Sequence, residues 1–468
     1  MQSGTNLHTT MDLLPIWDPA ACVPRREVLD GTLTDADLAL RLDAVVRGTA
    51  RAPYGDPRTF FEATHLTRSM KEILEYLFGR IAGARTDTNP VIVLDVGFGG
   101  GKTHTLVTLY YAAKYGTDPA IRPYLTGIPI PDGVRVVAIS GEDYGERGVI
   151  RNGTPVSTLW GDLFCQLGCL EQFRSLDLER QVPSLDEVKQ ALGNGPLLVL
   201  LDELPSLFKL YAKSDRAMMD RIVQFIQRLV IAVAEKERAA LVIAIAEDAY
   251  KDEAVLARET IRESGQLHAD DKRRLLEETH LAEGAMEDAR AQIRRKETIM
   301  SPVEEQDVVH ILRRRLFAST SNDMAEAVAD AYHTLYTTTT APEAFGKQDY
   351  RDALRNSYPF HPELVKVLYE RLATLDQFQR TRGALRLLSR AVRHCWEEKE
   401  SDAFLLHPHH IDLAVPTILE DLTKGIGEGR LRNALEGDLF RSAGGIAVQD
   451  LDDEVQAQWR APLHRRTY

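Results

Sequence analysis

Apolar and polar positions divide the chain into two regions with different patterns. In the first region, short unbroken apolar runs alternate with stretches of helical periodicity, whereas in the second region the helical periodicity continues alone. Strands are predicted at 91–95, 133–140, 197–201, 241–246 and 298–302. Unbroken apolar runs such as 197–201 are typical of strands buried on both faces of a parallel sheet. The pattern therefore predicts a parallel α/β domain followed by a helical domain.

The predicted helices carry apolar stripes with three- and four-residue spacing. They cover 34–46, 65–82, 106–111, 157–170, 184–192, 215–235, 303–317, 324–336, 362–375 and 382–396. The helix within 65–82 has Thr67 as its expected N-cap. The charge-dense stretch 251–295 is expected to form either a solvated helical pair or a coiled insertion that contacts a partner.

A glycine-rich turn links the first predicted strand to the next helix. The turn contains Gly97, Phe98, Gly99, Gly100 and Gly101, followed by Lys102, Thr103 and His104. A strand, a glycine-rich loop and a helix that begins with Lys-Thr form a P-loop, in which backbone N–H groups surround phosphate oxygens. Lys102 is then expected to reach the β- and γ-phosphates of ATP, and Thr103 to hold Mg²⁺. The usual first glycine of the motif is replaced by Val96.

Two acidic residues follow the third predicted strand, where a P-loop protein needs them. Asp202 and Glu203 come directly after the apolar run 197–201. In parallel sheets, ligands bind at the carboxyl ends of the strands. Asp202 is therefore expected to hold Mg²⁺ in the manner of a Walker B aspartate, and Glu203 to orient and polarise the attacking water.

Composition narrows the class of protein. The 468 residues are 44% hydrophobic and 27% charged, which is ordinary for a soluble globular protein of about two or three domains. The formal net charge of −13 argues against broad nucleic-acid binding, although a local basic patch stays compatible with it. The sequence lacks an apolar run long enough to span a membrane, and its polar start does not resemble a signal peptide, so a cytoplasmic location is expected.

Cysteine and histidine give weaker signals. Four cysteines in a chain of this length do not form a disulfide framework, so buried free thiols are expected. His407, His409 and His410 flank Pro408, but neither a cysteine nor an acid stands at ligand spacing from them. This segment is therefore expected to be a loop rather than a metal site.

Taken together, these motifs resemble those of an AAA+ ATPase. The chain is similar to a bacterial and archaeal AAA+ group whose genes lie near methyltransferase, helicase and nuclease genes in phage-defence neighbourhoods. The resemblance covers roughly residues 12–420. The motifs that carry it are Phe98–His104, Asp202-Glu203, Arg315-Leu316-Phe317, Tyr358–Pro362 and Phe378–Arg386.

The resemblance implies further roles for arginines. Arg386, which ends Gly-Ala-Leu-Arg, looks like a sensor 2 residue that touches the γ-phosphate, and Arg382 is the alternative. Arg294 and Arg295 precede the strand at 298–302 and are candidates for an arginine finger that acts on a neighbouring subunit's nucleotide.

The sensor 1 position departs from the family pattern. It should follow the strand at 241–246 with an uncharged polar residue, but the chain has Glu247 and Asp248 there. This departure and Val96 favour slow hydrolysis.

The resemblance also sets the expected domain boundaries. Residues 1–87 are expected to form a helical lead-in that packs on the nucleotide-binding domain, 88–302, which includes the charged insertion at about 251–295. Residues 303–423 are expected to form a helical lid. Residues 424–468 are expected to be a flexible or incomplete element of a chain that continues further.

Two functions follow as expectations. The first is an oligomeric AAA+ ATPase that couples Mg²⁺-dependent ATP hydrolysis to conformational work on DNA or on a defence complex containing a methyltransferase, helicase or nuclease. The second is an ATP-gated switch or scaffold with little hydrolysis. A small-molecule P-loop kinase is disfavoured, because the Asp-Glu pair and the long helical region suit water activation better than binding of an acceptor.

Overall fold

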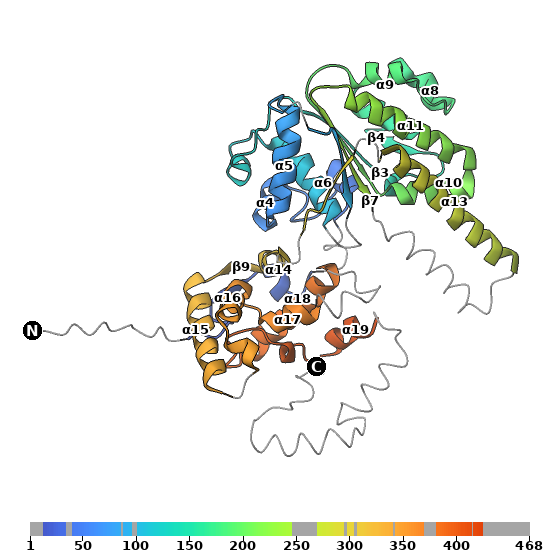
Figure 1. The fold of residues 1–468 in the computed structure, drawn as a ribbon. Coiled ribbons are helices and arrows are strands. Elements are labelled where there is room, and N and C mark those ends of the chain that lie inside the picture. The colour runs from blue at the N-terminus through green and yellow to red at the C-terminus, as the bar shows by residue number, and fades with distance from the viewer. Residues whose placement is uncertain are drawn as a thin grey trace, which may run out of the picture. The chain divides into compact units, whose positions relative to one another are not determined.

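The computed structural model describes residues 13–33, 40–85, 88–95, 101–245, 269–293, 297–303, 307–339, 342–368, 381–413 and 415–424 (Figure 1). The chain divides into two compact units. One, here called the α/β unit, comprises residues 40–304. The other, the helical unit, combines residues 1–39 with residues 305–468.

A five-stranded sheet forms the centre of the α/β unit in the described part of the chain. Its strands, in spatial order, are β3 (Arg135–Ser140), β6 (Leu197–Asp202), β7 (Ala239–Ile245), β2 (Val91–Asp95) and β8 (Glu297–Met300). All neighbouring strands pair in parallel. The five predicted strands and the predicted parallel sheet are therefore confirmed.

Helices cover both faces of this sheet (Figure 1). One face carries α3 (Leu42–Val46), α4 (Pro57–Ala63), α5 (Arg68–Ile81), α6 (Lys102–Tyr115) and the 3-10 turn η1 (Arg122–Leu125). The opposite face carries α7 (Leu159–Gln166), η3 (Leu170–Phe173), α8 (Arg174–Leu178), α9 (Leu185–Leu192), α10 (Leu204–Ser214), α11 (Arg216–Ala234) and α13 (Ala269–Ile293).

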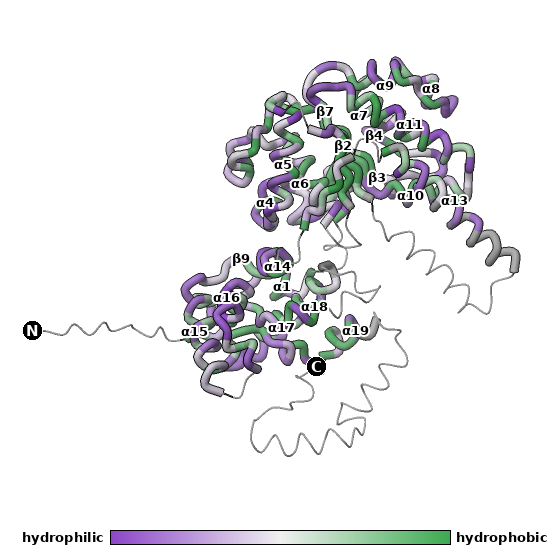
Figure 2. The backbone as a smooth tube through the Cα atoms, viewed as in Figure 1, coloured by the Kyte–Doolittle hydropathy of each residue, from purple (hydrophilic) through white to green (hydrophobic). Residues whose placement is uncertain are grey.

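Strand alternation explains why two separate cores form. Ile92 and Leu94 of β2 pack with the α5–α6 layer, whereas Val91 and Val93 pack with the layer on the other face. Because successive strand residues point to opposite faces, unbroken apolar strands fill both cores. The strands form a hydrophobic centre in Figure 2.

The order of the strands reverses direction beside β2. From β2 the chain crosses the sheet in one direction to β3, and then returns strand by strand through β6 and β7 to β8 on the other side of β2. Right-handed crossovers in opposite directions put α6 on one face and the later helices on the other. Such a reversal creates a binding crevice at the carboxyl ends of the strands.

The charged stretch before β8 is integrated into the α/β unit. The helix α13 is 25 residues long and buries Ala282, Ala285, Met286, Ala289 and Ile293 in the core with α10 and α11. The expected solvated helical pair is therefore wrong for 269–293, since this helix completes one layer of the unit. Residues 251–268 lie outside the described part of the chain.

The glycine-rich segment after β3 is also ordered. The stretch 141–155 contains η2 (Gly141–Asp143) and most of an antiparallel pair, β4 (Val149–Arg151) and β5 (Thr154–Val156). Buried Arg151 donates to the carboxylates of Asp143 and Asp162, which fixes this pair to α7. Polar contacts between distant residues therefore order a glycine-rich stretch.

Helices dominate the helical unit. They are α1 (Arg26–Leu29), α14 (Val308–Leu316), α15 (Asn322–Thr338), α16 (Gln348–Ser357), α17 (Pro362–Lys366), α18 (Thr381–Glu398) and α19 (Pro416–Lys424), with 3-10 turns η6 (Glu343–Gly346) and η10 (Pro408–His410). The expectation of helices alone after residue 303 is nevertheless wrong. Residues of β9 (Phe317–Thr320) pair with β1 (Cys22–Pro24) in an antiparallel ladder.

That ladder divides the expected N-terminal lead-in between the two units. Residues 13–33 pack in the helical unit, where Ile16, Ala21, Cys22 and Val28 are buried in its core. Residues 40–85 pack on the sheet of the α/β unit, as expected for the whole lead-in. A single lead-in over 1–87 is therefore replaced by two segments that belong to different cores.

None of the helices in the described residues combines the length and the apolarity that crossing a membrane requires. The four cysteines are free; Cys22 and Cys395 are buried, and Cys165 and Cys169 are half-buried. The expectation of free thiols is confirmed, and that of burial is confirmed for two of them.

Candidate functional site

The helix that follows β2 begins at the residues predicted to bind phosphate. Gly101 is the N-cap of α6 and has a φ of 81°, in the left-handed region that favours glycine. Lys102 and Thr103 are the first two residues of the helix. A helix N-terminus attracts anions through its free N–H groups and its dipole. Gly97, Phe98, Gly99 and Gly100, also predicted to contact phosphate, lie outside the described residues.

The fold brings the two predicted Mg²⁺ ligands together. The Thr103 hydroxyl donates a hydrogen bond to the carboxylate of Asp202, which ends β6. The N–H of Glu203 donates to Oδ1 of the same carboxylate over 3.1 Å. The strand β7 lies between β2 and β6, so residues 99 positions apart meet across one intervening strand.

The Asp202 carboxylate is buried, with only 3% of the residue exposed. Its pKa is raised from 3.8 to about 7, chiefly by burial and then by the nearby charge of Glu203, whereas the hydrogen bond from Thr103 acts in the opposite direction. A buried carboxylate needs a partner of opposite charge to stay ionised at low cost. Thr103 and Asp202 supply the oxygen ligands that Mg²⁺ prefers, so the site fits this ion.

The backbone at Glu203 has a strained conformation. Its φ of 50° and ψ of 39° lie in the left-handed region, which a residue with a side chain occupies at a cost of about 1 kcal/mol or more. Strained residues of this kind cluster at active sites. The same residue is the N-cap of α10, so the strain falls where β6 turns into the next helix.

A glycine after β3 is required by this turn. A Cβ built on Gly141 would lie 2.0 Å from the backbone oxygen of Glu203. The next residue, Glu142, adds a negative charge that raises the pKa of Asp202. Sequence reasoning missed both residues, although their position directly after a strand predicted to end at Ser140 was the available signal.

His104 lies in the first turn of α6 and contacts the lead-in helices. Its Nε2 lies 3.0 Å from the Thr64 hydroxyl, which itself donates to the carbonyl of Phe60 over 2.7 Å. The hydroxyl proton is therefore used, and Nε2 of His104 donates to the Thr64 oxygen. The imidazole also packs against the Phe60 ring, with centroids 4.8 Å apart. His104 thus joins the start of α6 to the end of α4.

The predicted arginines are not all described. Arg386 lies on α18 in the helical unit, where its Nε is 3.1 Å from Oδ1 of buried Asp421 on α19. Arg390 pairs with the same carboxylate over 2.7 Å. Arg382 lies on α18, but its side chain is outside the described part. Arg294 and Arg295, and the sensor 1 candidates Glu247 and Asp248, are also outside it.

The fold and site define an α/β protein whose five-stranded parallel sheet is flanked by helices, an architecture compatible with Rossmann-like and P-loop folds. The chain belongs to the DUF499 family. The DUF499 N-terminal domain matches residues 22–125 and 133–266, and the DUF499 second domain matches residues 303–427. No curated protein matches the chain. The family descriptions name no activity, ligand or partner.

Proposed function

We propose that this protein binds ATP with Mg²⁺ and hydrolyses it, in the manner of an AAA+ ATPase. The observation that supports this most directly is the hydrogen bond between Thr103 and Asp202, because it joins the helix after β2 to the acidic end of β6. If Lys102 and Thr103 followed a glycine-rich turn only by chance, Thr103 would have no reason to lie beside Asp202.

Each residue has a role in the proposed reaction. Lys102 and the N–H groups at the start of α6 bind the phosphates, and Thr103 and Asp202 hold the Mg²⁺. When bound, Mg²⁺ neutralises charge on the phosphate oxygens. Glu203 accepts a hydrogen bond from the attacking water and orients it towards the γ-phosphate.

The remaining parts of the proposal come from the resemblance to AAA+ proteins. Arg294 or Arg295 of a neighbouring subunit completes the site, so the active form is a homo-oligomer. Arg386 senses the γ-phosphate and couples a helical lid to the nucleotide. The energy of hydrolysis then drives work on DNA or on a cytoplasmic defence complex with a methyltransferase, helicase or nuclease.

An ATP-gated switch with little hydrolysis is the second candidate function. The pairing of Arg386 with Asp421 favours it, because this ion pair within the helical unit competes with a contact between Arg386 and a phosphate. In that case ATP binding, rather than hydrolysis, changes the state of the helical unit.

Steady-state ATP hydrolysis across a protein concentration series tests both functions. We expect wild type to hydrolyse ATP more than linearly with protein concentration, and Lys102→Ala and Glu203→Gln to be inactive. Lys114→Ala is the matched control, because Lys114 lies in the last turn of the same helix and hydrogen-bonds Tyr110. This variant should keep wild-type activity.

The outcomes separate the two functions. Binding of ATP by wild type without hydrolysis, and without any effect of Glu203→Gln, supports the switch and contradicts the ATPase. Failure of wild type to bind ATP in an equilibrium-binding assay contradicts both.

A further inference from the structure

A small cavity in the helical unit is surrounded by side chains of the kinds that bind metal ions. Its volume is about 10 Å³. Such a space holds one water molecule or one small ion. The residues that line it are His394, Cys395, Glu398, Glu400, His409, His410 and Asp412.

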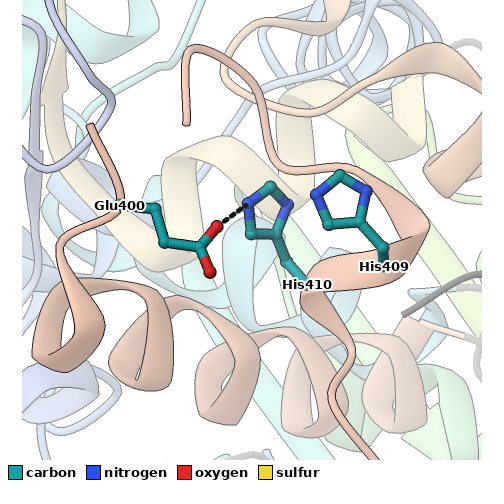
Figure 3. Close-up of side chains that lie close together, drawn as sticks. All are labelled: Glu400, His409 and His410. Carbon is teal, nitrogen blue, oxygen red and sulfur yellow. Dashed lines mark ion pairs between the residues drawn. The ribbon is translucent and has the colours of Figure 1, made fainter. Parts of the chain in front are cut away.

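Three of these residues converge on one point. The ligand atoms of Glu400, His409 and His410 all lie within 4.8 Å of one another. Nε2 of His410 is 3.8 Å from a carboxylate oxygen of Glu400, and the imidazole of His409 lies next to that of His410, with ring centroids 4.2 Å apart (Figure 3). His410 and Glu400 are largely protected from solvent, with side chains 7% and 27% exposed.

We propose that Glu400, His409 and His410 form a Zn²⁺ site. Two imidazoles and one carboxylate are a ligand set that Zn²⁺ uses in proteins, with a fourth position completed by water or another group. The same nitrogen and oxygen ligands suit Zn²⁺ better than Mg²⁺, which prefers oxygen alone. This site is separate from the proposed ATP site and does not depend on it.

The surrounding structure holds the three ligands in place. The indole N–H of Trp17 donates to the backbone carbonyl of Glu400 over 2.7 Å, which fixes the turn after α18. The backbone N–H of His410 donates to the carbonyl of His407 over 3.1 Å within η10. A bound Zn²⁺ therefore ties the turn after α18 to η10, and through Trp17 to the N-terminal segment of the unit.

Zinc binding changes one hydrogen bond at the site. The backbone N–H of His407 donates to Nδ1 of His410, so Nε2 carries the imidazole proton in the metal-free protein. Ligation through Nε2 moves the remaining proton to Nδ1 and breaks this bond. One neutral hydrogen bond is much weaker than a zinc–imidazole bond, and zinc uptake is accordingly coupled to rearrangement of the turn at 407–410.

Zinc titration of the untagged full chain, stripped with a chelator and kept free of ATP and Mg²⁺, tests the proposal. Competition with a chromophoric chelator measures affinity and stoichiometry. We expect wild type to bind one equivalent of Zn²⁺, and His409→Ala and Glu400→Gln to weaken this binding by more than tenfold. His280→Ala, which removes an exposed histidine of the α/β unit, is the matched control and should bind like wild type.

A second measurement guards against misfolded variants. Zn²⁺ should raise the thermal unfolding temperature of wild type and His280→Ala, but not that of Glu400→Gln, whose side chain keeps the same shape. Zinc binding that is absent from wild type, or equal in wild type and His409→Ala, overturns the proposal and leaves Glu400 and His410 as an ordinary polar contact.

Discussion

At the scale of the residue, several buried polar groups have protonation states that are set by their surroundings. Burial raises the pKa of the Asp202 carboxyl, whereas burial and neighbouring histidines lower the pKa of His361 and of His407. In each case the local environment favours the neutral form, and the sign of its effect on stability follows from that preference.

Asp202→Asn should stabilise the metal-free protein at pH 8. The folded-state pKa of Asp202 is raised from 3.8 to about 7. The protonated carboxyl therefore stabilises the folded protein fully below pH 3.8, and this stabilisation is lost as the pH rises through 7. An uncharged amide avoids this loss, which amounts to about 4 kcal/mol at most. Urea unfolding in the presence of a chelator measures the difference. A variant less stable than wild type under these conditions contradicts the argument.

His361→Asn should flatten the pH dependence of stability in the helical unit. His361 caps α17 by accepting from the N–H of Glu363, and its Nε2 donates to Tyr336 over 2.9 Å. Burial lowers its pKa from 6.5 to about 4, so stability falls as the pH drops between these values, by about 3 kcal/mol in total.

Asparagine keeps a capping acceptor but does not titrate in this range. Thermal unfolding of wild type and His361→Asn from pH 7.5 to 4.5 checks this prediction. Burial also lowers the pKa of His407, so His407 too makes stability fall as the pH drops. It accounts for the pH dependence of stability that remains in His361→Asn. An unchanged slope in the variant shows that His361 is not the group responsible.

At the scale of the element, single side chains at helix ends join distant parts of the α/β unit. Thr67 is the N-cap of α5 and accepts from the N–H of Met70 over 2.9 Å, while its hydroxyl donates to the carbonyl of Pro302 over 2.6 Å. His104 similarly joins α6 to α4 through Thr64. The ends of α4, α5, α6 and β8 are therefore held together around the proposed ATP site.

Thr67→Val should destabilise the α/β unit by about 2–3 kcal/mol. The substitution removes the cap and leaves the Pro302 carbonyl without its buried donor, and each loss costs about 1 kcal/mol or more. Thr67→Ser keeps the hydroxyl and is the control, with an expected loss below 1 kcal/mol. Equal effects of the two substitutions in chemical unfolding indicate that the methyl group, rather than the hydroxyl, matters.

At the scale of the whole molecule, the N-terminal segment belongs to the unit formed by the C-terminal helices. Ile16 is fully buried in that core, and its N–H donates to the carbonyl of Ala403 over 2.8 Å. The α/β unit is thus inserted between two parts of the helical unit along the sequence.

Ile16→Ala should destabilise the helical unit and leave the α/β unit unchanged. Loss of a buried isoleucine costs about 2–4 kcal/mol. Hydrogen–deuterium exchange should accelerate in α15 and α18, whereas β2, β6 and β7 should exchange at the wild-type rate. Ile299→Ala, at a position 60% exposed on β8, is the control and should change neither unit. Faster exchange in the strands after Ile16→Ala contradicts the division into units.

The sequence by itself determined the strands, the helix caps and the residues of the proposed ATP site. Unbroken apolar runs indicated strands buried on both faces, Thr67 indicated a helix start, and Lys102, Thr103 and Asp202 stood at positions that a P-loop protein uses. Each of these signals is local, because it depends on residue type and short spacing.

Only the tertiary structure decided which distant residues meet. The pairing of β1 with β9, the burial of one face of α13, and the approach of Glu400 to His409 and His410 depend on contacts between segments far apart in the chain. Such contacts leave no spacing pattern in a single sequence. The histidines at 407–410 were therefore expected to form an ordinary loop, and the carboxylate that makes them a candidate metal site comes from Glu400 in the turn after α18.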